Sequence, residues 1–130
     1  MRPPDSAVRE RARRGDRDGA IPQLRQAVDD MFNAGQLGYW VTANALFVET
    51  LLERGRDRDL ADAEAAVDQL AAVSAHHAWV ISDVWLLRLR ALLARARGDE
   101  DAYCDYRDRY RAMATELGFE GHMRWAEAMP

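Results

Sequence analysis

The sequence predicts an all-α fold in which six or seven helices pack as stacked antiparallel hairpins. Three observations lead to this expectation. Apolar residues recur at three- and four-residue spacing along nearly the whole chain, and no stretch alternates with period two. Turn segments rich in glycine and aspartate separate these stretches at regular intervals. The connections are short, so successive helices are expected to run antiparallel.

The positions of the individual helices are predicted from the spacing of apolar residues and from the turn segments that interrupt it. We expect helices near residues 6–14, 18–34, 38–54, 59–75, 79–97, 99–117 and 121–129. Glycines stand where helices often end in a left-handed residue, namely Gly15, Gly35, Gly55, Gly98 and Gly118. Aspartates stand at three expected N-caps, Asp16, Asp59 and Asp99. Pro22 lies near the start of its helix, where a missing N–H costs little.

The helix expected near 99–117 carries a row of large side chains on one face: Tyr103, Tyr106, Tyr110, Met113 and Leu117. A platform for stacking nucleic-acid bases would require a basic surround, whereas the residues around this row carry both signs of charge. We therefore interpret the tyrosines as a core seam with their hydroxyls at its edge.

The helix expected near 79–97 has two apolar faces. One runs from Ile81 through Trp85 and Leu89, and Arg88 and Arg95 lie along a boundary between the two faces. A helix with two apolar faces needs neighbours on both sides, as in a stacked array of hairpins.

Two domain segments are expected. Residues 1–14 form a basic N-terminal segment or incomplete hairpin, and residues 15–130 form a single helical repeat domain. The first segment offers few apolar residues to cover the helix near 18–34, so we expect a homodimer or an upstream domain to cover it.

Internal repeats support the stacked arrangement. "GDRDGAIPQLRQAVDDM" and "GDEDAYCDYRDRYRAMATEL" open alike, and Ala20, Ala63 and Ala102 mark comparable points 43 and 39 residues apart. The first copy resembles the tetratricopeptide repeat at Gly15, Asp16, Ala20, Leu24 and Ala27, although the period exceeds the usual ~34 residues. This resemblance implies a tetratricopeptide-like right-handed α-solenoid.

A wider resemblance covers about Gly15 to Pro130. The segments "LFVETLLERG", "VWLLRLRALLARARGDEDAY" and "LGFEGHMRWAEAM" are similar to the C-terminal helical region of actinobacterial multidomain signalling proteins. Those proteins carry a nucleotide cyclase domain or an ATPase module, sometimes with a LuxR-type helix-turn-helix. The resemblance implies a regulatory region rather than an active domain.

Composition argues against several functional classes. The net charge of −4 disfavours general polyanion binding, and the basic residues near the N-terminus have no aromatic residues among them, so we do not expect nucleic-acid binding. All 18 basic residues are arginine, which excludes a P-loop lysine and a Schiff base. The sequence has no secretory signal and no long apolar run, so we expect a cytoplasmic protein without a membrane span.

Residue types capable of chemistry are present but scattered. His76 and His77 are adjacent and therefore do not form an i,i+4 chelate, while acidic neighbours disfavour a reactive thiolate at Cys104. Glu49 and Glu53 form an i,i+4 carboxylate pair at a helix end, where solvation is the simpler interpretation. We expect no catalytic residue, no metal and no cofactor.

The sequence therefore predicts a non-catalytic module that binds a protein or peptide. The expected partner-binding residues are Trp40, Asn44, Glu49, Trp85, Arg88 and Arg95. The alternative hypothesis is a small-molecule or nucleotide-sensing regulatory domain, with a ligand pocket between helices lined by Trp85 and Tyr106.

Overall fold

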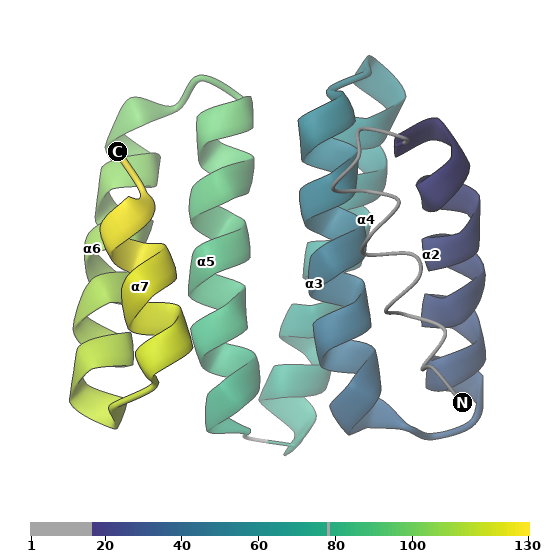
Figure 1. Ribbon diagram of the computed structural model, residues 1–130, viewed down its shortest axis with the longest axis horizontal. Helices are drawn as coiled ribbons and strands as arrows, with labels where there is room; N and C mark the ends of the chain where they lie inside the picture. The colour runs from purple at the N-terminus through teal and green to yellow at the C-terminus, as the bar shows by residue number, and fades with distance from the viewer. Residues whose placement is uncertain (1–16, 78) are drawn as a thin grey trace. The chain divides into compact units, whose positions relative to one another are not determined.

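The computed structural model describes residues 17–77 and 79–130, and every regular element in these ranges is a helix (Figure 1). The helices are α2 (Arg17–Asn33), α3 (Leu37–Arg54), α4 (Asp57–His77), α5 (Val80–Ala96), α6 (Glu100–Leu117) and α7 (Glu120–Ala128). The expected segment 6–14, with Gly15 and Asp16, lies outside the described residues. None of the described helices combines the length and apolar character that crossing a membrane requires.

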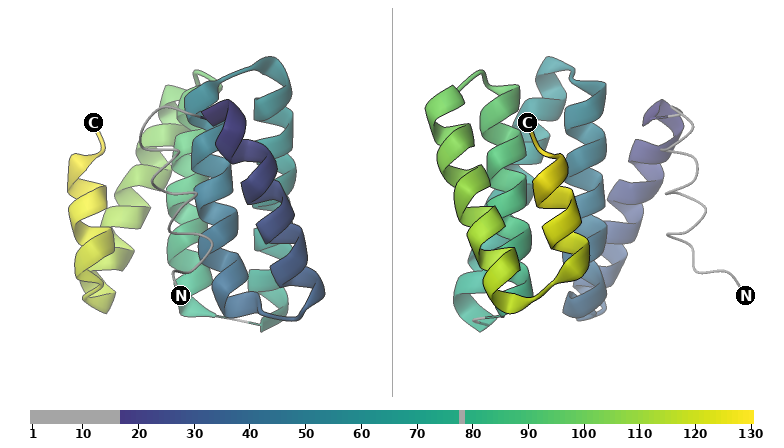
Figure 2. Two further views of the ribbon diagram at one scale, coloured as in Figure 1. Left: turned by 45° about the vertical axis from the view of Figure 1, so that its right-hand side comes forward. Right: turned by 60° about the vertical axis from the view of Figure 1, so that its left-hand side comes forward.

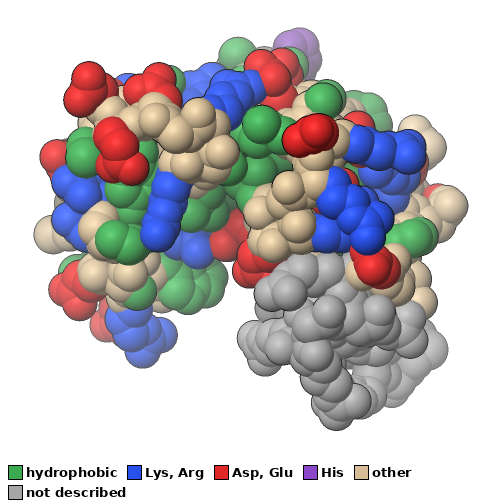
Figure 3. Space-filling view, turned by 90° about the horizontal axis from the view of Figure 1, so that it is seen from above, with side chains coloured by type: hydrophobic (Ala, Val, Ile, Leu, Met, Phe, Trp, Pro, Cys, Tyr) green, Lys and Arg blue, Asp and Glu red, His purple; other side chains and the backbone are tan. Residues whose placement is uncertain are grey.

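The chain divides into two compact units, Met1–Ala66 and Val67–Pro130, with the boundary inside α4. Unit 1 contains α2, α3 and the first part of α4. Unit 2 contains the rest of α4 together with α5, α6 and α7. Arginine and acidic side chains intermix on the face shown in Figure 3, with hydrophobic side chains among them.

In unit 1, α2 and α3 lie side by side as an antiparallel hairpin (Figures 1 and 2). Gly35 reverses the chain between them with a φ of 72°, a conformation that costs glycine little. Its buried apolar residues include Ala20, Ile21, Leu24 and Val28 from α2, Trp40, Val41, Val48 and Leu51 from α3, and Ala63 and Ala66 from α4. The predicted hairpin is thus confirmed for this pair of helices.

The start of α4 differs from the expectation. The helix begins at Asp57, so Asp59 is its third residue and not its N-cap. The Asp59 carboxylate accepts the backbone N–H of Arg56 at 3.2 Å, which is the reach-back contact of a capping box. It also accepts two N–H groups of Arg54, at 2.7 and 2.6 Å. These hydrogen bonds hold the pKa of the buried Asp59 below its ordinary value.

In unit 2, α5, α6 and α7 share one core (Figures 1 and 2). Its buried members are Val84, Ala91, Ala94, Tyr103, Tyr110, Ala126 and Met129. The tyrosine seam on α6 is confirmed, because Tyr103 and Tyr110 are buried and Tyr106 packs against the core, while Leu117 at the helix end is exposed. The expected N-cap at Asp99 is also confirmed, since its Oδ1 accepts the N–H of Ala102 at 3.1 Å.

Helix α5 is buried on more than one side. Val84, Ala91 and Ala94 face the core of unit 2, and Leu86, Leu89 and Leu93 are buried as well. Of the two apolar faces expected from the sequence, one keeps Trp85 and Leu89 buried and the other keeps Val84, Ala91 and Ala94 buried. Its first turn departs from the expectation, because Val80 and Ile81 are exposed.

Candidate functional site

The six predicted partner-binding residues are placed very differently. Trp40 and Asn44 are 0% exposed in the interior of unit 1. The Asn44 amide donates to the backbone oxygen of Ala66 at 3.0 Å, and the Trp40 ring meets Phe32 edge-on at 5.4 Å between centroids. In this structure neither side chain offers surface to a partner. Glu49, further along α3, is half-buried.

The other three predicted residues lie on α5 in unit 2. Arg95 is exposed, and its guanidinium lies 5.7 Å from the centre of the Tyr103 ring. Trp85 is buried and Arg88 is half-buried, and both contact the same group of aromatic side chains. We call this group, formed by Trp85, Arg88, Tyr110, His122 and Trp125, the Trp125 cluster.

The Trp125 cluster depends on spacing along two helices. Trp85 and Arg88 are three residues apart on α5, and His122 and Trp125 are three residues apart on α7, so each pair shares a helix face. Gly118 makes the second pair possible, because its φ of 70° ends α6 and lets α7 fold back on the core. The result is a contact between aromatic rings from α5 and α7.

The rings in the cluster touch at distances typical of aromatic pairs. The Trp85 ring centre lies 4.6 Å from that of His122 and 5.5 Å from that of Trp125. The His122 and Trp125 rings meet edge-on at 5.0 Å. The Arg88 guanidinium lies 5.5 Å from the centre of the Trp125 ring, within range for a cation–π interaction.

His122 is the titratable centre of the cluster. Its Nδ1 lies 2.7 Å from the Tyr110 hydroxyl, which donates when that nitrogen is unprotonated. Burial, together with the positive charge of Arg88, lowers the pKa of His122 to about 4. The ring is therefore neutral at pH 7, and the tyrosine hydroxyl holds it in place.

Exposure within the cluster is uneven. Trp85 is 8% exposed and His122 6%, whereas Trp125 is 44% exposed. The Trp125 indole is thus the exposed member of the cluster, and the buried rings of Trp85 and His122 pack against it. Trp85 and Arg88 were expected from the sequence as contact residues and Trp125 was not, although its three-residue spacing from His122 is visible in the sequence.

A second set of contacts in unit 2 anchors the end of α7. The Tyr103 hydroxyl and the Arg107 guanidinium donate to the backbone oxygen of Pro130 at 3.0 and 2.8 Å. Arg111 donates through Nε to the backbone oxygen of Ala126 at 2.9 Å. Arg111 thus adds a donor to a carbonyl in the last turn of α7, and Tyr103 and Arg107 hold Pro130, which follows the helix, against α6.

The remaining candidates for chemistry do not converge. His76 and His77 are exposed, and the His77 ring stacks on Trp79 at 4.9 Å between centroids. Cys104 is half-buried. Within residues 17–77 and 79–130, no group of three or more histidine, cysteine or acidic side chains is arranged to hold a metal ion.

No family model, curated protein or solved structure matches this chain. The packing and exposure of its own side chains are therefore the guide to its function. Among the residues predicted from sequence, the structure brings Trp85 and Arg88 together, and it adds Trp125 to them.

Proposed function

We propose that the chain is a non-catalytic protein–protein interaction module and that Trp125 is its main contact residue. The observation that carries this proposal is a 44% exposed indole supported by Trp85, Arg88 and His122. Tryptophan, tyrosine and arginine dominate the binding energy of protein interfaces. A side chain already immobilised by its neighbours loses less rotamer entropy when a partner covers it.

Unit 1 offers a similar residue. Tyr39, in the first turn of α3, is 74% exposed, and the neighbouring Trp40 anchors the same turn in the interior. Phe32, near the end of α2, is 38% exposed and contacts Trp40. These rings supply a second exposed aromatic surface on a rigid hairpin, which suits an interaction module.

The finer architecture belongs to the same proposal. We propose a tetratricopeptide-like solenoid, supported by the α2–α3 and α5–α6 hairpins and by the sequence repeats. Kinship with the C-terminal region of multidomain signalling regulators and a cytoplasmic location remain part of this hypothesis. A second copy of the chain is one candidate partner, and light scattering at high concentration tests it.

A phage-displayed random peptide library selected on the full chain tests the proposal. We expect a family of related peptides whose binding saturates. Trp125→Ala should weaken them at least tenfold, because loss of a major interface residue costs ~2 kcal/mol or more. Trp79→Ala, which removes a tryptophan outside the cluster, is the matched control and should leave the affinity within twofold. If Trp125→Ala and Trp79→Ala bind the selected peptides with equal affinity, Trp125 is not the main contact residue.

The alternative, a ligand-sensing domain with a pocket beside Trp85 and Tyr106, has less support. The Trp85 ring packs on His122 and Trp125, and these rings occupy the space beside it. A thermal-shift screen against nucleotides, cyclic ones included, distinguishes the two hypotheses. A saturable rise in melting temperature, together with failure of the peptide selection, would favour the sensor.

A further inference from the structure

The His122 ring is enclosed by aromatic side chains from several parts of unit 2. Between ring centres, Trp85 of α5 lies at 4.6 Å, Tyr110 of α6 at 5.7 Å and Phe119, just before α7, at 6.3 Å. Trp125, three residues further along α7, meets the same ring at 5.0 Å. The buried imidazole therefore joins α7 to both neighbouring helices.

The polar and charged groups that face the ring favour its neutral form. From α6, the Tyr110 hydroxyl lies 2.7 Å from Nδ1. From α5 comes Arg88, whose guanidinium lies 6.0 Å from the Tyr110 ring centre and 5.5 Å from that of Trp125. Burial and this positive charge both lower the pKa of His122. A proton on the imidazole would place two positive charges in one aromatic group.

Other charged side chains on these helices are exposed or held by other contacts. Asp83 of α5 accepts the Ser74 hydroxyl of α4. Arg111 of α6 donates to the backbone oxygens of Ala126 and Met129. The charged residues of α7 are exposed to solvent, which screens them: Glu120, Arg124 and Glu127.

Helix α7, which lies beside α5 and α6 (Figure 1), depends on these neighbours. Its nine residues make about two and a half turns, too few for a stable helix in water. The rings of His122 and Trp125 hold it to α5, and Arg111 holds its last turn to α6. Gly118, at the junction with α6, can change its backbone conformation at little cost.

We propose that His122 is a proton-sensitive latch that couples the packing of α7, and with it the Trp125 contact surface, to pH. The proposal rests on the proposed interaction function and adds its regulation. When the ring is neutral, α7 packs on α5 and Trp125 is held ready for a partner. When the ring takes a proton from solvent, the buried charge and repulsion by Arg88 favour separation of α7 from α5, so that Trp125 loses its support and the partner is released.

The size of the effect follows from linkage between protonation and opening. Once α7 opens, the imidazole regains its ordinary pKa of 6.5, whereas its pKa in the closed state is about 4. The equilibrium constant for opening therefore rises about twentyfold between pH 7 and pH 5.

Amide hydrogen exchange of the full chain measures this opening. At pH 7, protection factors in α7 should lie at least tenfold below those in α5, because α7 opens by itself. Between pH 7 and pH 5 they should fall about twentyfold further. Equal protection in α7 and α5 would mean that α7 opens only when the whole of unit 2 unfolds, and would overturn the latch.

Two histidine variants show whether the proton acts at His122. In His122→Asn, which does not titrate, protection in α7 should change less than twofold between the two pH values. His76→Asn removes an exposed histidine of the same unit and should keep the full response. Equal responses in wild type and His122→Asn overturn the proposal. If His122→Asn does not fold, the wild type decides by itself, because equal α7 protection at pH 7 and pH 5 refutes the latch.

A peptide selected at pH 7 that depends on Trp125 tests the coupling to partner binding. At ten times its Kd at pH 5, this peptide should raise protection in α7 about tenfold, because it binds only the closed form. Unchanged protection with the peptide bound would uncouple Trp125 from the latch and overturn the proposal. If the selection yields no peptide that depends on Trp125, the interaction function fails, while exchange in α7 still decides whether the latch exists.

Discussion

Lowering the pH from 7 to 5 should destabilise unit 2 through His122. Its folded pKa is about 4, below the ordinary value of 6.5, because the ring is buried beside Arg88. Between these two values the unfolded chain binds a proton that the folded chain does not. The stabilisation that comes from keeping the His122 ring neutral is therefore fully present above about pH 6.5. It is lost as the pH falls toward 4.

The magnitude follows from the two pKa values. The separation between 6.5 and about 4 corresponds to ~3 kcal/mol when fully expressed, at ~1.4 kcal/mol per pH unit. From pH 7 to pH 5 the expected loss is about 2 kcal/mol, because the unfolded histidine is mostly neutral at the first pH and mostly charged at the second.

Urea denaturation at several pH values measures this loss. His122→Asn is the comparison variant, because its side-chain oxygen can accept the Tyr110 hydroxyl in place of Nδ1 but does not titrate. The variant should be less stable at every pH, since it loses ring contacts, and its stability should vary far less between pH 7 and 5. Equal slopes for the two proteins, or an NMR titration of His122 near pH 6.5, would refute the reasoning.

Three further predictions concern stability. Asp59→Asn should cost about 2 kcal/mol in urea denaturation, because buried charged hydrogen bonds are lost, whereas Asp105→Asn in an exposed ion pair should cost less than ~0.5 kcal/mol. Gly118→Ala should lower stability by ~1 kcal/mol, because its φ of 70° is unfavourable for alanine. Gly38→Ala should raise stability by roughly 0.5 to 1 kcal/mol, because Gly38 lies inside α3 and has open space around it. Thermal melts of both variants measure these changes. Arg111→Met should remove the side-chain donor to the Met129 carbonyl and leave the Ala126 carbonyl with only the N–H of Met129. Amide hydrogen exchange in α7 should become faster while exchange in α5 stays unchanged.

The all-α class and the positions of the helices were predictable because local signals agree. Periodicity located the helices, and Gly35, Gly55, Gly98 and Gly118 all adopt the left-handed conformation that ends a helix. The start of α4 was less predictable. Asp59, at the third helical position, accepts the backbone N–H of Arg56, the residue before the helix. An aspartate is common at both positions, so the sequence alone placed the N-cap at Asp59, three residues too late.

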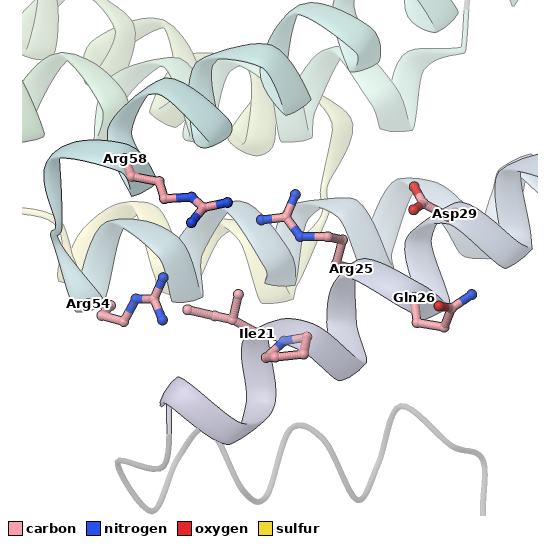
Figure 4. A pocket seen from close by; sticks show the side chains of 7 residues that line it. Ile21, Arg25, Gln26, Asp29, Arg54 and Arg58 are labelled. Atoms are coloured by element: carbon pink, nitrogen blue, oxygen red, sulfur yellow. The ribbon is translucent and has the colours of Figure 1, made fainter.

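The sites were harder to predict because they depend on contacts between helices. Helical spacing on α5 pointed to Trp85 and Arg88, but the exposure of Trp125 depends on how α7 lies against α5. Trp40 and Asn44 show the opposite case, since their residue types suggested a binding surface and both are buried in unit 1, Asn44 with a hydrogen bond to Ala66 of α4. A pocket in unit 1 lined by Arg25, Arg54 and Arg58, among others, takes residues from three helices (Figure 4), so no spacing along the chain could reveal it.

The placement of the tryptophans gives the protein intrinsic optical probes. Trp40 is buried in the interior of unit 1, whereas Trp125 in unit 2 is partly open to solvent and lies close to the Arg88 guanidinium. Their emission should therefore differ in colour and in accessibility to quenchers. Replacing all but one tryptophan by phenylalanine would show whether the two halves of the molecule melt together or in sequence.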